Sequence, residues 1–152
     1  MSISILFITA LMLSSPVTIS SMMENGNYTL WVEPNGNEIA GMQADFLYDG
    51  RYVKVNEIVE GDLISQHDNF STFFNEGTII PPARIVNTFD AVIGMHSTSI
   101  PGTFVILNVT GNGCIVPENV KISDSNGNPI FYEVIPYCEL QVGSISGSVN
   151  NE

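Results

Sequence analysis

The feature that most constrains the fold is a series of short apolar runs, each ended by turn-forming residues. From residue 22 onward no stretch has a convincing apolar period of 3.6 residues, so few or no helices are expected. Tyr28–Val32 ends at the Pro34–Asn37 turn, and Gly41–Tyr48 alternates apolar and polar side chains before the Asp49–Gly50 turn. Gly102–Val109 is apolar on both faces, as in a covered central strand. About eight or nine strands without intervening helices predict an all-β antiparallel sandwich of jelly-roll topology.

The charge balance of the chain excludes one class of partner. Lys and Arg total 4 and Asp and Glu total 16, which gives a formal net charge of −12. A surface this negative repels phosphate backbones and anionic lipid headgroups, so we expect no nucleic-acid partner. At 152 residues with 44% hydrophobic side chains, the chain is long and apolar enough for one folded domain.

The amino-terminal segment has the composition of a secretory leader. Ile3–Leu13 is an apolar run of eleven residues followed by Ser14–Pro16, and it is too short to span a bilayer unless the stretch through Ile19 joins it. A cleaved signal, an uncleaved anchor and a buried first strand are the three interpretations. We divide the chain into residues 1–21 as signal peptide or N-terminal anchor, 22–143 as the β-sandwich domain and 144–152 as a linker stub. The leader predicts a secreted or cell-surface location, without membrane contact beyond such an anchor.

Two further features fit an exported protein. The Asn-x-Ser/Thr triplets at Asn27 and Asn69 are candidate glycosylation sites, whereas the triplet at Asn108 lies in an expected central strand, where a glycan is hard to place. Cys114 and Cys138 would close a loop of about 24 residues in an oxidising compartment. Because the sequence does not fix their separation in space, a disulfide and two free thiols both stay open.

The residue types that catalysis or a metal site would need are sparse. His67 and His96 each lie in a Ser/Thr/Asn/Asp-rich stretch that is typical of an exposed loop. Asp124–Asn128 begins like a calcium loop but lacks the later Gly and Glu positions, so an ordinary turn is the better interpretation. We therefore expect no enzyme activity and no cofactor. A weak Ca²⁺ site built from the loop carboxylates Asp62 and Asp68 is the open alternative.

Four stretches of the chain carry recognisable strand and turn motifs in a fixed order. Ala40–Asp49 ends in Tyr-Asp, and Val53–Leu63 ends in a Gly-Asp-Leu turn. Pro101–Phe104 leads into the apolar central run, and Asn119–Asn128 contains an Asp-x-Asn-Gly turn. In this order the four stretches resemble a cohesin domain, in particular the divergent cohesin-like modules of archaeal surface proteins. No single stretch is specific, but their common order extends over most of the chain.

The resemblance implies a nine-stranded jelly roll that binds dockerin modules non-covalently and has no catalytic activity. By analogy the binding face uses the third, fifth, sixth and eighth strands, here Gly41–Tyr48, Phe70–Phe74, Ala83–Ile93 and Asn119–Ser123. Alternation within these strands predicts that seven side chains point away from the core and contact a partner: Gln43, Asp45, Arg84, Thr88, Asp90, Lys121 and Ser123. Gly41 and Gln43 stand where many dockerin-binding cohesins carry Asn-x-Asp.

Two other functions are compatible with a β-sandwich. A carbohydrate-binding module would present flat aromatic rings to polysaccharide, but Trp31, between Leu30 and Val32, is expected to pack in the core. Phe70, Phe73 and Phe74 are expected to plug one end of the sandwich. A structural component of the cell envelope would instead use a sheet face to bind copies of itself. The expected partner is thus a protein, of dockerin type by resemblance, with polysaccharide or envelope components as alternatives.

Overall fold

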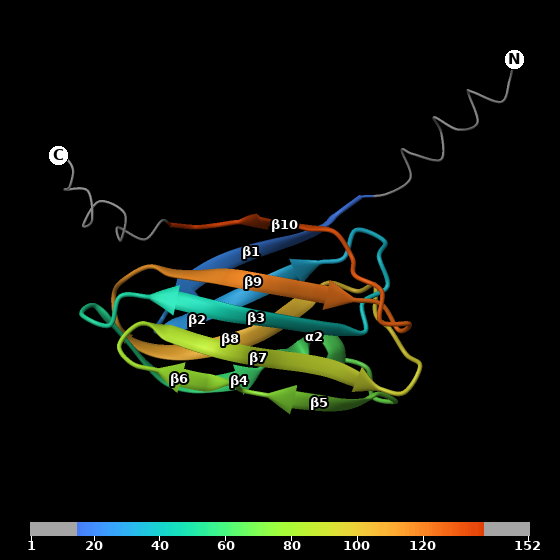
Figure 1. The fold of residues 1–152 in the computed structure, drawn as a ribbon, viewed down its shortest axis with the longest axis horizontal. Coiled ribbons are helices and arrows are strands. Elements are labelled where there is room, and N and C mark those ends of the chain that lie inside the picture. The colour runs from blue at the N-terminus through green and yellow to red at the C-terminus, as the bar shows by residue number, and fades with distance from the viewer. Residues whose placement is uncertain (1–14, 139–152) are drawn as a thin grey trace, which may run out of the picture.

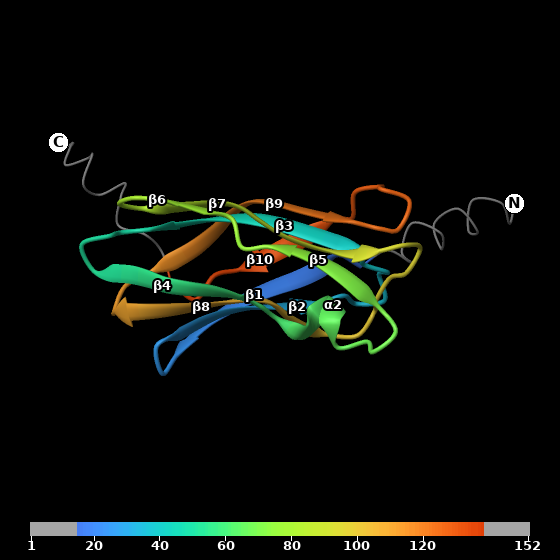
Figure 2. The same cartoon turned by 90° about the horizontal axis from the view of Figure 1, so that it is seen from below.

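The computed structural model describes residues 15–138, which form two β-sheets packed face to face (Figures 1 and 2). Ten strands and one short helix follow each other along the chain: β1 (Val17–Glu24), β2 (Asn27–Glu33), β3 (Gly41–Tyr48), β4 (Val53–Glu60), α2 (Asp62–Ser65), β5 (Ser71–Asn75), β6 (Thr78–Ile80), β7 (Arg84–Ile93), β8 (Gly102–Gly111), β9 (Ile115–Ser123) and β10 (Tyr132–Ile135). The predicted all-β sandwich is confirmed, with ten strands in place of eight or nine.

The two sheets differ in how their strands are ordered. The front sheet, which faces the viewer in Figure 1, has the order β5-β7-β3-β9, and β6 also pairs with β7. The rear sheet has the order β10-β1-β2-β8-β4. Neighbouring strands are antiparallel except β1 and β10, which are parallel. Because β3 and β9, and likewise β3 and β7, are far apart in sequence, the front sheet is held together by long-range pairing.

Strand β1 corrects the predicted domain boundary. It starts at Val17, inside the segment 1–21 that the sequence assigned to a leader, so the predicted start at residue 22 falls within the strand. Val17 and Ile19 are fully buried, and β1 pairs with both β2 and β10. The apolar Ile3–Leu13 run is followed closely by a strand that begins with apolar residues, so the sequence gives no signal for where the domain begins. Residues 1–14 and 139–152 lie outside the described residues, and so do most of the predicted leader and all of the predicted linker stub.

One hydrophobic core lies between the sheets, and its largest side chains come from both of them. Tyr28 of β2, Phe46 of β3 and Phe104 of β8 are fully buried, and the rings of Tyr28 and Phe46 meet edge to face at 5.9 Å. The Tyr28 hydroxyl lies 2.9 Å from Ser21 Oγ, and burial raises the pKa of this phenol. Trp31 was predicted to join this core, but it points outward with 43% of its surface exposed. Leu30 and Val32, which flank Trp31 on β2, point into the core, so the alternation of the strand turns Trp31 outward.

The helical content of the described chain is a single four-residue helix, α2, which connects β4 to β5. Leu63 and Ile64 of this helix are buried under the end of the sandwich. No helix within residues 15–138 is long and apolar enough to cross a membrane.

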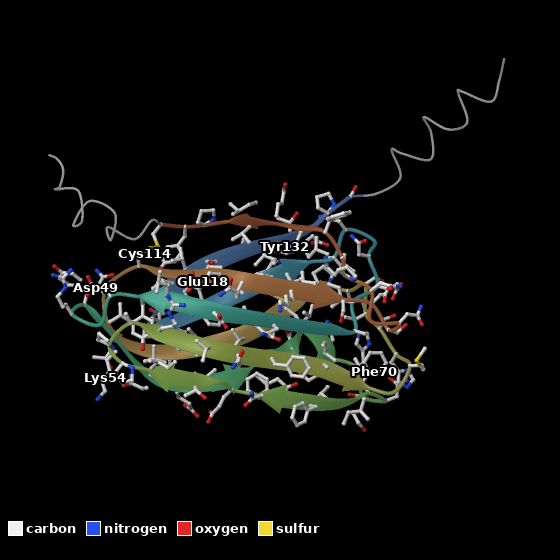
Figure 3. All side chains as sticks on the ribbon, in the orientation of Figure 1. Asp49, Lys54, Phe70, Cys114, Glu118 and Tyr132 are labelled. Atoms are coloured by element: carbon white, nitrogen blue, oxygen red, sulfur yellow. A yellow bond between two sulfur atoms is a disulfide. The ribbon has the colours of Figure 1, made fainter. Side chains whose placement is uncertain are left out.

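A disulfide joins the two cysteines and fastens the last strand to the domain. Cys114, just before β9, is bonded to Cys138, after β10, with a Cα–Cα distance of 5.8 Å (Figure 3). The neighbouring Tyr137 hydroxyl donates to the carbonyl of Gly113 at 3.2 Å, and its ring lies 6.0 Å from Tyr28. Strand β10 is therefore held along its whole length by pairing with β1 and beyond its end by this covalent link.

The disulfide gives a first prediction. A variant with both Cys114→Ser and Cys138→Ser should keep the β-sheet circular dichroism but lose about 3 kcal/mol of unfolding free energy, because the 24-residue separation no longer restrains the unfolded chain. Chemical denaturation of the variant and of the oxidised parent measures the difference. Equal unfolding midpoints for the two proteins would show that the link does not stabilise the domain.

Candidate partner-binding face

The outward side of the front sheet, called the front face below, carries two adjacent rows of side chains that cross four strands. Strand registers place the members of each row side by side: Ser123, Gly41, Ala91 and Phe73 in one row, and Lys121, Gln43, Phe89 and Asn75 in the other. The rings of Phe73 and Phe89 lie 5.9 Å apart, and Phe73 is 56% exposed. Two aromatic rings next to small residues make this part of the face apolar.

The small residues of the first row leave a hollow in the front face. A Cβ atom added at Gly41 would lie 3.4 Å from Ser123 Oγ and 3.5 Å from Ala91 Cβ, so the floor of the hollow is close to the backbone. A groove of about 380 Å³ opens there. Its walls come from the front face and from the segment that leads into β10, which contributes Ile130 and Tyr132. The groove suits a side chain inserted from a partner rather than a small enclosed ligand.

Asp45, at the centre of β3, fixes the backbone of both neighbouring strands. Its Oδ1 accepts the backbone N–H of Asn87 on β7 at 2.9 Å, and its Oδ2 accepts the side-chain amide of Asn119 on β9 at 2.9 Å. Asn87 and Asn119 have φ values of 64° and 51°, in the left-handed region that Asn tolerates better than most residues. The register of β3 shifts at Asp45 relative to both neighbours. One carboxylate therefore stabilises a bulge on each side.

The bulge at Asn87 reverses the predicted alternation along β7. Thr88 and Asp90 were predicted to face a partner, but they point into the core and are 0% and 1% exposed. Phe89 and Ala91, predicted to face inward, lie on the front face instead. An extra residue in a strand exchanges its two sides beyond the bulge, and the one signal for it in the sequence is an Asn in the middle of a strand.

The other five predicted contact residues lie on the outward side of the front sheet, and all of them except Asp45 are at least partly exposed. Gln43, Lys121 and Ser123 lie on the front face around the hollow, as the alternation predicted. Arg84 is exposed further along the face, where its guanidinium forms an ion pair with Glu118 at 3.1 Å (Figure 3). Asp45 lies on the outward side but is only 8% exposed, because its neighbours cover it. It is therefore a positioning residue and not a contact residue.

Comparison with known proteins identifies the fold. No protein-family model and no curated protein matches the chain. Solved structures do match, among them a non-cellulosomal cohesin from the archaeon Archaeoglobus fulgidus, with a TM-score of 0.59 at 12% identity, covering 80% of this chain and 87% of that one. The second type II cohesin module of the ScaA scaffoldin from Acetivibrio cellulolyticus gives 0.58 at 16% identity, covering 82% and 95%. The chain has the cohesin fold.

A third match is a chain of a type I cohesin–dockerin complex from Clostridium thermocellum, with a TM-score of 0.57 at 13% identity, covering 80% of this chain and 95% of that one. At identities this low, the likeness establishes the cohesin fold and not its function. The third, fifth, sixth and eighth strands predicted from the resemblance correspond to β3, β5, β7 and β9. These four strands form the front sheet of this cohesin fold.

Both histidines pack against one phenylalanine at the end of the cohesin fold that lies opposite the Asp49 turn (Figure 3). The ring of Phe70 lies 4.4 Å from that of His67 and 4.9 Å from that of His96, on which it stacks. His67 Nε2 is also 2.7 Å from the hydroxyl of buried Thr98. Both histidines lie in loops as predicted, but only His96 is exposed, whereas His67 is half-buried. Phe70 packs against the core at this end as predicted, whereas Phe73 lies exposed on the front face. No group of three or more His, Cys, Asp or Glu side chains suited to a metal occurs within residues 15–138.

The carboxylates of Asp124 and Asp62 accept hydrogen bonds within the protein, whereas that of Asp68 is exposed. Asp124 Oδ1 accepts the backbone N–H groups of Asn126 and Asn128 at 2.9 Å each, and these hydrogen bonds lower the pKa of the carboxyl. Asp62 Oδ1 accepts the N–H of Thr103 at 2.8 Å, and Asp68 is exposed. The absence of a cofactor stays a prediction.

The outward side of the rear sheet is largely polar. Asn27 and Asn108, two of the three glycosylation triplets, are paired across β2 and β8, and the Asn108 amide donates to Asn27 Oδ1 at 3.2 Å. Trp31 also lies on this side, where its neighbours in register are Ser20 and Thr103. Asn69 is exposed in the turn before β5. Glycosylation at Asn27 and Asn69 stays a prediction.

The role of Asp45 gives a second prediction. Asp45→Ala removes two charge-assisted hydrogen bonds and should cost roughly 2–4 kcal/mol of unfolding free energy. Asp45→Asn keeps one acceptor oxygen for Asn87, and the Asn119 amide can rotate to meet the new NH₂ group, so it should cost about 1 kcal/mol. Urea denaturation measures both. If the alanine variant were no less stable than the asparagine variant, Asp45 would not be holding the bulges.

Proposed function

We propose that the protein is a non-catalytic attachment module that binds a dockerin-type protein partner through the front face. The observation that supports this proposal most directly is the apolar centre of the front face, where Phe73 and Phe89 lie beside the hollow at Gly41. Aromatic anchors next to a pocket are typical of the residues that dominate binding energy in protein interfaces. Solved chains of the same fold include cohesins in complexes with dockerins.

The charge distribution supports the same face. The chain has only four Lys and Arg residues against sixteen Asp and Glu, and two of the four cations, Arg84 and Lys121, lie on the front face. Arg51 is paired with Asp49 in the β3–β4 turn. A partner that approaches this molecule of net charge −12 therefore meets cationic side chains on the front face, and acidic groups on that partner would face Lys121.

A secreted or cell-surface location is part of the proposal. The disulfide between Cys114 and Cys138 supports it, because such links persist in oxidising compartments and are rare in the cytosol. The apolar Ile3–Leu13 run is the sequence feature that would direct export.

Carbohydrate binding has less support than protein binding. Trp31 is exposed as a sugar platform would be, but it has Ser20 and Thr103 beside it in place of a second ring. Self-association through the apolar front face is the competing outcome of the experiment described next.

The third prediction compares exposed aromatics on the two faces. Phe73→Ser should weaken capture by a responsive member of an immobilised panel of dockerin modules at least roughly tenfold, because it removes an interface anchor. Trp31→Ser is the matched control, since it removes a similarly exposed ring from the rear sheet, and it should leave capture unchanged. Surface plasmon resonance measures the affinities, and thermal unfolding checks that both variants are folded.

Three outcomes would contradict the proposed function. Capture that depends on Trp31 and not on Phe73 would assign binding to the rear face. Retention of the wild-type protein on polysaccharide in affinity electrophoresis, abolished by Trp31→Ser, would favour the carbohydrate alternative. A concentration-dependent dimer in light scattering that Phe73→Ser dissociates, together with no dockerin capture, would make the front face a self-association surface.

A further inference from the structure

Two carboxyl groups face each other in the interior behind the front face. Asp90 points inward from β7 and is 1% exposed, and the half-buried side chain of Glu60, at the end of β4 in the rear sheet, lies within hydrogen-bonding reach of it. Both carboxylate oxygens of Asp90, and Oε2 of Glu60, are buried without a hydrogen-bond partner in the described chain. Buried carboxylate oxygens without donors are costly, which favours a hydrogen-bond donor between the two groups.

Glu60 is the charged neighbour of Asp90, and the side chains beside Asp90 on the neighbouring strands are apolar. Strand registers place Met42 of β3 and Phe74 of β5 on either side of Asp90, on the same inward surface. Helix α2 packs against β5 and β7 with its buried residues Leu63 and Ile64. No other charged group among the described residues raises or lowers the pKa of Asp90.

We propose that Glu60 and Asp90 share one proton, held by Asp90 and donated to Glu60, and that this hydrogen bond ties the two sheets together behind the front face. The carboxyl proton is the hydrogen that the unpartnered oxygens lack. When solvent base removes it, two carboxylates remain in an apolar interior, and their repulsion favours opening of the contact between β4 and β7. A bound cation is the competing species, but two carboxylates provide few of the oxygen ligands that Ca²⁺ requires.

The pair lies where it can affect partner binding, a consequence that rests on the proposed function. Asp90 is flanked on β7 by Phe89 and Ala91, whose side chains form the centre of the front face. Loosening of β7 would displace both of them relative to Gly41 and Phe73. The shared proton therefore keeps the front face in its binding geometry at acidic to neutral pH.

The pKa direction gives the sign of the pH dependence. Burial, followed by the hydrogen bond and like charge of Glu60, raises the pKa of Asp90 from 3.8 to about 8. The native state therefore holds a proton that the unfolded chain has already released above its ordinary pKa. Stability from this group is fully present below that pKa and is lost as the pH rises through about 8.

The fourth prediction compares the melting temperature at about pH 6 and about pH 9. The wild-type protein should melt roughly 5–10 °C lower at the higher pH, whereas Asp90→Asn, whose amide cannot ionise, should melt at nearly the same temperature at both. Glu57→Gln is the matched control, because it removes a carboxylate from an exposed position on β4 and should keep the wild-type fall. Glu60→Gln is the second variant if Asp90→Asn does not fold. Its amide can donate to Asp90 at either pH, so the fall should shrink by at least half.

Hydrogen–deuterium exchange locates the change without any partner. When the pH is raised from about 6 to about 9, the backbone amides of β7 and β4 in the wild-type protein should lose protection against exchange, after correction for the intrinsic exchange rates. The same amides in Asp90→Asn should keep their protection. If the wild-type melting temperature did not fall, or if Asp90→Asn showed the same fall, the proposal that Glu60 and Asp90 share a proton would be wrong. Restoration of wild-type stability at about pH 9 by millimolar Ca²⁺, without effect on Asp90→Asn, would also overturn it in favour of a bound cation.

The effect on binding is tested separately with a dockerin that the panel captures. Wild-type affinity should fall severalfold from about pH 6 to about pH 9, and the affinity of Asp90→Asn should not. Equal affinities at both pH values, alongside the predicted fall in melting temperature, would leave the shared proton in place but overturn its control of binding. If no dockerin is captured at all, the proposed function fails. The stability measurements still decide whether Glu60 and Asp90 share a proton.

Discussion

The geometry of the front face depends on the carboxylate of Asp45. By accepting one hydrogen bond from the β7 backbone and one from the Asn119 side chain, it holds Asn87 and Asn119 in conformations that interrupt regular pairing. Beyond the bulge on β7, Phe89 turns outward and Asp90 turns inward. A regular strand would place the aromatic ring in the core and the acid in solvent. A single buried carboxylate thus decides which side chains are available to a partner and which are enclosed.

The outward surfaces of the two sheets differ in polarity. This difference fits the proposed function, in which the front face binds the partner. The front face has an apolar centre. The residues Gly41, Ala91 and Ser123 in this centre have small side chains or none, so a partner can approach the backbone closely. The rear sheet carries an amide network in which Asn56 donates to Thr110 Oγ1 at 2.8 Å, next to the paired Asn27 and Asn108. Polar side chains that bond to one another make this surface well hydrated and a poor site for apolar docking.

Acidity has opposite consequences outside and inside the molecule. On the surface, a net charge of −12 repels anionic polymers, and two of the four cationic side chains, Arg84 and Lys121, lie on the front face. In the interior, the same residue types cannot remain fully charged, and the Glu60–Asp90 pair requires a proton to join the sheets. The pair and the disulfide act at different places: the proton joins β4 to β7, while the covalent link holds the chain after β10 to the segment before β9.

Local sequence patterns predicted the strands correctly because alternation and turn residues act over a few positions. The Pro34–Asn37 and Asp49–Gly50 turns end their strands as expected, and Gln43, Lys121 and Ser123 lie on the predicted face. The candidate site was predicted only in part. Alternation carried along β7 without a bulge assigned Thr88 and Asp90 to the wrong side, and β1 was divided by a boundary placed at residue 22.

The sequence by itself determined the all-β class, the acidity, and the positions of most strands, since these follow from composition and short-range periodicity. Tertiary structure alone decided the bulges, the stacking of His96 on Phe70, the pairing of Cys114 with Cys138, and the meeting of Glu60 with Asp90. Each of these joins residues that are distant in the chain, and Asp45 itself reaches partners 42 and 74 positions away. Local patterns contain no information about such contacts, because the partner that satisfies a buried polar group is chosen by the packing of the sheets.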